Sequence, residues 1–321
     1  KIHAAYLRFK NENDQSREEA EKLADMFEKG LETLGYIAAT LNLIGDYAHL
    51  LAFYLDDSEK AISVLQKGLE IPRLRPEQSG MLKTEMADIY IYAGDPWEAT
   101  LLYSQVIESN KNNLLGDEVK LKKAMLGYYM GNFGWAKAQL DVLKASTSKF
   151  TANDAMELSM LIGNNLNLDT TAVPLQMFAR ADLLFFRNKE ARAMATLDSI
   201  AEIYPYHSLL ENILLRKAKI EIEQNRYELA AEYLQEITEN HSYGLLADKA
   251  LFMLAELNNY NLGEKEKAKE LYRLMLTRYP GSVFVEESRE KFRELRETYP
   301  DIITNPQEEL FLEETVPDEI N

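Results

Sequence analysis

Residue types that can carry catalysis are present in this sequence, but their spacing forms no catalytic or metal-binding motif. The four histidines are scattered, and no zinc-type H-E-x-x-H occurs: they are His3, His49, His207 and His241. The sequence also lacks the G-x-S-x-G nucleophile elbow, the G-x-x-x-x-G-K-[ST] phosphate loop and the G-x-G-x-x-G dinucleotide fingerprint. It has no cysteine, which excludes disulfides, thiolate catalysis and cysteine-bound metals. We therefore expect no enzymatic activity, no cofactor and no metal.

The charge balance of the chain argues against a nucleic-acid partner. Acidic residues outnumber basic ones by 53 to 36, which gives a net charge of −17 at pH 7. Binding to nucleic acid needs a basic stripe that replaces phosphate counterions. Adjacent carboxylates such as Glu18-Glu19 and Glu286-Glu287 are expected by chance in so acidic a sequence, and we assign them to solvated helix faces. Residues 301–321 contain seven acidic side chains and no Lys or Arg, and we expect an acidic irregular tail there.

Aromatic side chains recur in a pattern that could bind a partner. Four successive pairs of bulky residues each stand eight and seven positions before an alanine, and three residues before each pair lies an apolar or acidic residue. Rings and carboxylates at one register would line a groove for a protein or peptide segment. The predicted partner-binding residues are Phe53, Tyr54, Asp88, Ile91, Tyr92, Met125, Tyr128, Tyr129, Asp182, Phe185 and Phe186. The alternative is that these aromatics pack between helices, and at least one of each pair should do so because adjacent residues face different ways on a helix.

The elements that would position these pairs are short helices joined by tight turns. The clearest example is Met86–Glu108, where Gly94 can end one helix in the left-handed conformation. Asp95 can then cap the next helix, Pro96 fits its first position, and Glu98 completes a capping-box spacing. Each helix has one apolar stripe, so the hairpin needs neighbours to bury it.

The small residue of this hairpin is Ala99, and alanines in the same position recur along the chain at a nearly regular period. Equivalent alanines, each followed by apolar residues about four and seven positions later, are separated by 38, 37, 57, 37 and 38 residues: Ala61, Ala99, Ala136, Ala193, Ala230 and Ala268. The hairpin resembles a tetratricopeptide unit, whose signature is a small residue, two residues, Tyr, and then Ala, three residues and an aromatic, with a period of about 34. This resemblance implies an all-α fold, a right-handed α-α superhelix, or α-solenoid, of such repeats.

The spacing of 57 indicates one irregular extra helix near the middle of the array. We expect residues 1–148 to form a block of helical hairpins, 149–169 an inserted helix with its loops, 170–298 a second block with a closing helix, and 299–321 the tail. The inserted helix would either cap the first block or act as a hinge or partner-contacting lip.

Two segments resemble bacterial cell-envelope proteins that contain these repeats. The Tyr-Pro-Gly-Ser turn at Tyr279 and the closing helix after it are similar to the end of the repeat arrays in outer-membrane-assembly lipoproteins and in the Tol–Pal coordinator protein. Residues 135–162 resemble a poorly characterised bacterial family of tetratricopeptide proteins. The resemblance implies a periplasmic or envelope location, with a cytoplasmic one as the alternative.

The function that we expect is a non-enzymatic scaffold that binds a protein or peptide segment along the concave face of the superhelix. The alternative is a carbohydrate-binding envelope protein whose exposed aromatics stack on sugars. No apolar run reaches the roughly 18–20 residues that a transmembrane helix needs. Because the chain opens at Lys1 without a methionine, we expect a processed form or a fragment.

Overall fold

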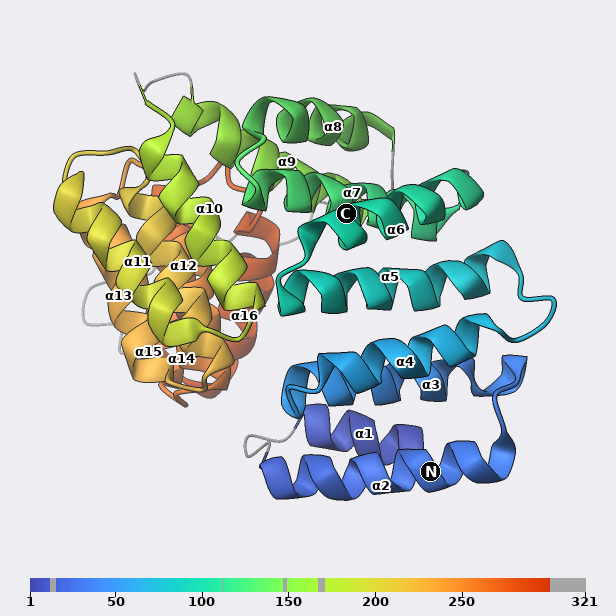
Figure 1. Ribbon diagram of the computed structural model, residues 1–321. Coiled ribbons are helices and arrows are strands. Elements are labelled where there is room, and N and C mark those ends of the chain that lie inside the picture. The colour runs from blue at the N-terminus through green and yellow to red at the C-terminus, as the bar shows by residue number, and fades with distance from the viewer. Residues whose placement is uncertain (12–15, 112, 147–148, 167–170, 301–321) are drawn as a thin grey trace, which may run out of the picture. The chain divides into compact units, whose positions relative to one another are not determined.

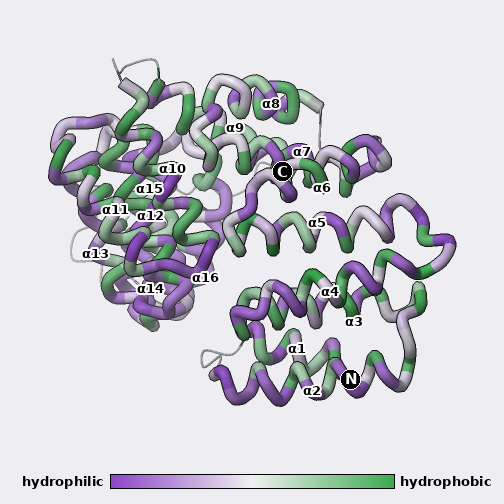
Figure 2. The backbone as a smooth tube through the Cα atoms, in the orientation of Figure 1, coloured by the Kyte–Doolittle hydropathy of each residue, from purple (hydrophilic) through white to green (hydrophobic). Residues whose placement is uncertain are grey.

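The structure is a computed structural model that describes residues 1–11, 16–111, 113–146, 149–166 and 171–300. It contains two compact units, Lys1–Thr196 and the part from Leu197 onward. Within the described ranges every regular element is a helix and none is a strand, which confirms the all-α fold (Figure 1). Figure 2 shows apolar and polar residues interspersed along the helices.

The first unit is an array of helices in which consecutive elements pack against one another. Its elements are α1 (Ile2–Asn11), α2 (Arg17–Leu34), η1 (Ala38–Thr40), α3 (Leu41–His49), η2 (Leu50–Tyr54), α4 (Ser58–Leu69), α5 (Pro76–Ala93), α6 (Pro96–Ser109), α7 (Leu114–Tyr129), α8 (Phe133–Ser146), α9 (Lys149–Leu166) and α10 (Val173–Phe186). Helix α11 (Glu190–Ile203) spans the boundary between the units.

The second unit continues the same construction. Its elements are α12 (Leu210–Glu223), α13 (Tyr227–Asn240), α14 (Ala247–Tyr260), α15 (Lys265–Arg278) and α16 (Val285–Thr298). The closing helix α16 packs on α15 and buries Phe292 completely, next to a stacked ring pair formed by Phe252 and Phe284 with centroids 4.7 Å apart.

The hairpin α5–α6 forms for the local reasons that its sequence indicates. Gly94 adopts φ +101° and its N–H donates to the carbonyl of Tyr90 at 2.9 Å, which ends α5. The carboxylate of Asp95 accepts the N–H of Glu98 at 3.4 Å, and Pro96 is the first residue of α6. The turn therefore satisfies backbone groups that the two helix ends would otherwise leave unpaired.

The repeated alanine is buried in each hairpin. All six are fully buried, with a relative exposure of 0%: Ala61, Ala99, Ala136, Ala193, Ala230 and Ala268. The residues that follow at the expected spacing are buried with them, including Tyr103 and Val106 in α6 and Tyr272 and Met275 in α15. A small side chain at this position lets the two helix backbones approach, and the apolar stripe beyond it fills the core.

The inserted helix is α9, and it lies in the first compact unit. It packs on α8, where the hydroxyl of Ser159 donates to the carboxylate of Asp141 at 2.6 Å. The ammonium groups of Lys137 and Lys144 lie 2.7 Å from the same carboxylate, and these three contacts hold the pKa of Asp141 well below its usual value. The compact units divide at 196/197, whereas the sequence predicts blocks separated by residues 149–169. Residues 167–169 and 301–321 of the predicted insertion and tail lie outside the described ranges.

Candidate partner-binding surface

Four of the predicted aromatic side chains lie together in the first unit, although they come from four different hairpins. We call Phe53, Tyr92, Tyr129 and Phe186 the aromatic row. The ring of Phe53 has its centroid 4.8 Å from that of Tyr92 and 6.2 Å from that of Phe186, and Phe186 lies 6.2 Å from Tyr129. All four are half-buried. The recurring register therefore does bring these rings onto one surface.

The first ring of the row is positioned by an unusual turn. In η2 the N–H of Leu55 donates to the carbonyl of Leu50 at 3.2 Å, a bond between residues five apart that widens the helix. Phe53 and Tyr54 both remain half-buried there. The ring of His49 stacks on Phe53 with centroids 4.5 Å apart, and Tyr54 reaches Phe9 of α1 at 5.0 Å. Tyr54 therefore packs against the core of the first unit, because Phe9 is buried.

The last ring of the row is held in place by the end of α10. The Nε of Arg187 donates to the backbone carbonyl of Tyr92 at 2.9 Å, and the Nδ2 of Asn188 donates to the carbonyl of Phe53 at 3.0 Å. These carbonyls belong to the last turns of α5 and η2, where no helical N–H remains to pair with them. A guanidinium group also suits the negative end of a helix dipole. The α10–α11 turn therefore ties together hairpins that are far apart in sequence.

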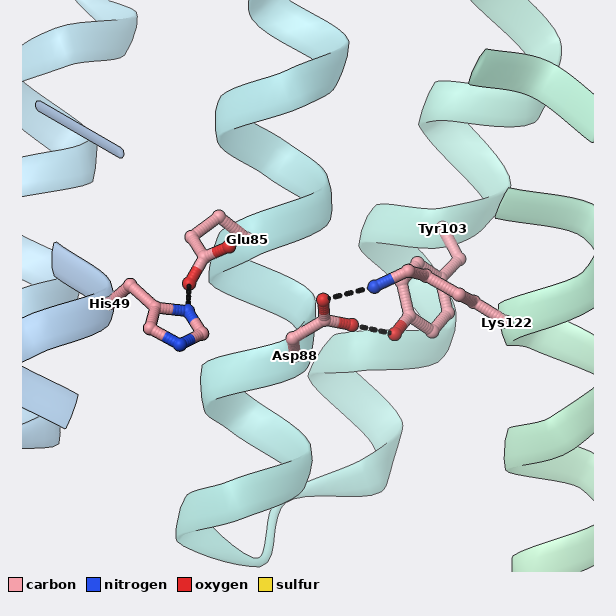
Figure 3. Close-up of polar contacts among 5 residues, drawn as sticks. All are labelled: His49, Glu85, Asp88, Tyr103 and Lys122. Atoms are coloured by element: carbon pink, nitrogen blue, oxygen red, sulfur yellow. Dashed lines mark hydrogen bonds and ion pairs between the residues drawn. The ribbon is translucent and has the colours of Figure 1, made fainter. Parts of the chain in front are cut away.

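The two predicted carboxylates are buried and bind groups of the chain itself. Asp88 accepts hydrogen bonds from the hydroxyl of Tyr103 and from the ammonium of Lys122 (Figure 3). Burial raises the pKa of Asp88 above its ordinary value, and the contacts with Lys122 and Tyr103 offset part of this rise. Asp182 accepts the hydroxyl of Tyr128 at 2.9 Å. The structure therefore gives both carboxylates a role in fixing tyrosine hydroxyls inside the array, a contact that the sequence prediction did not include.

The other predicted residues divide between core and surface as adjacent helix positions must. Ile91 and Tyr128 are 4% and 1% exposed, so their side chains belong to the core. Their neighbours Tyr92 and Tyr129 point to the half-buried row. Met125, Phe185 and Tyr54 are half-buried, and Leu50, at the register of Asp88, is fully buried.

Sequence reasoning missed the polar residues that surround the row. The Nδ1 of His49 lies 2.9 Å from a carboxylate oxygen of Glu85, and Figure 3 shows this pair on one side of α5 and the Asp88 contacts on the other.

The tyrosine partners of the carboxylates could have been predicted from their position relative to the anchor alanine. Tyr103 follows its anchor alanine by four residues, as Tyr272 does in the last hairpin, and the hydroxyl of Tyr272 donates to Glu256 on the preceding helix. Arg187 and Asn188 carried no such signal, because their contacts lie 95 and 135 residues away.

Neither metal binding nor membrane crossing finds a candidate among the described residues. They contain no group of three or more His, Asp and Glu side chains that could hold a metal ion. None of the helices in the described ranges combines the length and the apolar character that crossing a membrane requires.

Consecutive helices packed on one another in pairs, with a fully buried alanine in the second helix of each repeated pair, define an α-solenoid repeat protein. The family model of the tetratricopeptide repeat matches residues 249–282, which form the α14–α15 hairpin and the turn after it. This stretch of the chain is a tetratricopeptide repeat. The matched repeat is the one anchored by Ala268, whereas the sequence pattern is clearest around Ala99.

Solved structures that resemble the chain include repeat proteins of the same kind. The C-terminal part of a TPR repeat-containing protein from Cytophaga hutchinsonii is 15% identical, with 90% of this chain and 99% of that one covered and a TM-score of 0.33. A tetratricopeptide repeat protein from Parabacteroides merdae is 10% identical, with coverages of 91% and 99% and a TM-score of 0.34. Yeast Tom70 is 16% identical, with coverages of 93% and 63% and a TM-score of 0.32. A comparison with curated proteins finds no match. Similarities of this size carry no information about shared partners.

Proposed function

We propose that this protein is a non-enzymatic scaffold that binds a protein or peptide segment on the surface formed by the aromatic row. The observation that supports the proposal is the row itself, which is half-buried and therefore still offers ring surface to a partner. Aromatic side chains supply large contact areas at interfaces with little loss of conformational entropy. The tetratricopeptide fold suggests the same kind of function, because stacked repeats present extended binding surfaces.

Charged groups beside the row fit a peptide better than an apolar ligand. The side chain of Lys122 is 41% exposed and that of Glu85 is 23% exposed, so both remain within reach of a partner while they hold Asp88 and His49. They would fix the direction of a bound segment through groups of opposite charge at its two ends. Direct contact with the partner is proposed for the row, and Asp88 and Asp182 act by positioning the residues around it.

The resemblance to bacterial envelope proteins supports the cell envelope as the place to look for the partner. We would use the chain as bait on an envelope extract and measure the affinity of the isolated partner. Replacement of Tyr92 and Tyr129 together by Ala should weaken binding about 30-fold or more, since anchors of this type contribute about 2 kcal/mol or more. Circular dichroism and the denaturant midpoint show whether the variant is folded.

A matched control comes from two tyrosines outside the row. Tyr206 and Tyr243 are fully exposed, and their joint replacement by Ala should leave binding unchanged. Unchanged capture by the folded Tyr92→Ala, Tyr129→Ala variant would refute the proposal. Binding to a glycan array that is lost in the same variant would replace the peptide by a carbohydrate as the ligand of the row.

A further inference from the structure

Three successive turns of the second unit share one backbone hydrogen-bond pattern. They join α11 to α12, α13 to α14 and α15 to α16, and they cover residues 204–209, 241–246 and 279–284. In each turn the N–H of the fourth residue donates to the carbonyl of the first at 2.8–3.1 Å, and the first residue of the next helix donates to the carbonyl of the fourth at 3.2–3.4 Å. Pro205 and Pro280 hold the second position, which β-turns favour for proline. The repeat of the helices therefore extends to the turns between them.

Side chains join each of these turns to the next. A carboxylate oxygen of Glu211, which follows the first turn, accepts the N–H of Leu246 in the second at 3.2 Å. The hydroxyl of Tyr279 in the third turn donates to the carbonyl of Ser242 in the second at 2.7 Å. The three turns thus form one continuous strip of the second unit.

Large apolar side chains are exposed at two positions of the repeated turn. The third position holds Tyr206 and Tyr243, which are 98% and 103% exposed. The fifth position holds Leu245 and Val283, which are 70% and 87% exposed. We call these four side chains the turn edge. The two tyrosines alone present about 300–500 Å² of surface, a range in which exposed apolar patches are often functional.

The turn edge is flanked mainly by carboxylates. The residues within two positions of the three turns include one basic side chain, that of Arg278, and five acidic ones: Glu202, Glu211, Glu239, Asp248 and Glu286. Asp248 accepts the hydroxyl of Ser282 at 2.7 Å, and Glu211 accepts a backbone N–H, so these neutral donors leave the negative charges in place. The partial charges of the helix dipoles cancel here, because each turn joins the end of one helix to the start of the next.

This charge distribution decides which occupant fits. An anionic membrane surface would be repelled by the carboxylates. A second copy of the chain in a two-fold contact would bring the same carboxylates against one another, because such an interface is isologous. A segment that carries Lys or Arg beside apolar residues matches both the exposed side chains and the charges around them.

We propose that the turn edge binds an extended segment of a partner protein in which apolar residues alternate with Lys or Arg. The apolar residues of the segment cover the four side chains of the turn edge, and its basic residues pair with the flanking carboxylates. Because the exposed side chains belong to three successive turns, the segment runs from one turn to the next. Salt weakens the ionic part of the contact. This surface and its ligand are separate from the aromatic row and the partner proposed for it.

Peptides of defined chemistry test the occupant. We would screen the full chain against arrayed synthetic peptides of about 12 residues, which span about 40 Å when extended. One set alternates apolar residues with Lys or Arg, a second set has Glu in place of the basic residues, and a third has Ser in place of the apolar ones. We expect binding to members of the first set alone. No binding to the first set, or equal binding to either of the others, would overturn the proposal.

Substitutions on the turn edge locate the site of the peptide selected from the first set. Leu245→Ser with Val283→Ser should weaken its affinity, measured by fluorescence anisotropy, about tenfold or more. Leu229→Ser, the same change at an exposed leucine of α13, should leave the affinity unchanged. All three side chains are exposed, so the variants keep their fold, which circular dichroism verifies. Unchanged affinity in the Leu245→Ser, Val283→Ser variant would contradict the proposal.

Two pairs of tyrosines separate this surface from the aromatic row. Tyr206→Ala with Tyr243→Ala should abolish binding of the peptide, whereas Tyr92→Ala with Tyr129→Ala should retain it. The opposite result would place the peptide on the aromatic row. It would overturn this inference and leave the function proposed for the row intact.

Charge reversal tests the flanking carboxylates. Glu202→Lys with Glu239→Lys should weaken binding of the basic peptide about tenfold and allow members of the Glu-containing set to bind. Lysine is favourable in the last turn of a helix, so this variant keeps its fold. The control, Glu232→Lys with Glu236→Lys, makes the same change at exposed positions in the middle of α13 and should keep the preference for the basic peptide. Equal loss in both variants would show that only net charge matters and would refute the site.

Two measurements on the same variants test the other occupants. The wild-type chain should neither bind vesicles that contain phosphatidylserine nor dimerise in sedimentation equilibrium through the turn edge. Vesicle binding that Tyr206→Ala with Tyr243→Ala abolishes would replace the peptide by a lipid surface. Dimerisation that the same variant abolishes would replace it by a second copy of the chain. Either result would overturn the proposal.

Discussion

A single buried carboxylate connects three helices of the first unit. Asp88 on α5 receives the hydroxyl of Tyr103 on α6 and the ammonium of Lys122 on α7, and its side chain is only 12% exposed. Burying a carboxylate is unfavourable unless it is paired and hydrogen-bonded, and here both conditions are met. Burial raises the pKa of Asp88, and the cation opposes that rise. The side chain that sequence reasoning assigned to a partner therefore organises its own hairpin and the next.

Removal of the cation should destabilise the protein in a pH-dependent way. We expect Lys122→Met to lower the free energy of unfolding by about 1–2 kcal/mol at pH 7, less than for a fully buried pair because Lys122 is 41% exposed. A carboxyl whose folded-state pKa lies above its unfolded value, about 3.9, binds more protons in the folded state. Unfolding free energy then decreases as pH rises above about 4, and the loss of Lys122 strengthens this effect.

The measurement is urea denaturation of wild type and variant between pH 4 and 7. The deficit of Lys122→Met should grow as the pH rises. The control is Lys22→Met, which breaks a solvent-exposed pair with Glu18 and should leave the stability nearly unchanged at every pH. A deficit that stays constant over this range would show that Asp88 does not depend on Lys122 for its charge.

At the scale of elements, the end of α10 is the least predictable feature of the first unit. An isolated hairpin array contacts only its neighbours, yet Arg187 and Asn188 reach the last turns of α5 and η2. Phe186 adds ring contacts with Phe53 and Tyr129. The extra helix α9 precedes α10 in the sequence, and α10 packs against both α9 and α7.

Loss of the Arg187 contact should loosen these helix ends without unfolding the unit. Arg187→Ala should lower stability by about 1–2 kcal/mol, the range for a charge-assisted hydrogen bond. Amide hydrogen exchange should accelerate in peptides that cover η2 and the end of α5. Arg192→Ala, an exposed arginine on α11, serves as the control and should change neither quantity. Unchanged exchange at η2 and α5 in the Arg187 variant would refute the role of this contact.

At the scale of the whole molecule, the sequence predicts the repeat architecture well because local signals and periodicity agree. The turn around Gly94 and the buried positions of the six anchor alanines all follow from spacing and residue type. The side-chain assignments are less complete, since the residue eleven positions before an anchor alanine can face a partner or a tyrosine of another helix in the array. For Asp88 and Asp182 the tyrosine hydroxyl is the partner that the structure shows. Contacts across 95 or 135 residues leave no pattern in a single sequence.

The anchor alanines provide a test of the register along the chain. Ala99→Leu and Ala268→Leu should each destabilise the protein by about 1–3 kcal/mol, because a larger side chain cannot fit where exposure is 0%. Ala93→Leu and Ala138→Leu place the same change at exposed helix positions and should be nearly neutral. An unchanged denaturant midpoint for either anchor variant would show that the hairpin concerned is assigned in the wrong register.

The tie between α10 and the early hairpins has a mechanical consequence. A stack in which each hairpin touches only the next deforms like a spring, and its small relative rotations add up along the stack. The Asn188 contact with Phe53 and the Arg187 contact with Tyr92 join segments that are 135 and 95 residues apart. We call these two hydrogen bonds the braces, because they restrict rotation of the hairpins between them. Under tension applied along the chain, these two hydrogen bonds would bear load before the helix interfaces between them. The first unit should therefore be stiff until the braces break and compliant afterwards.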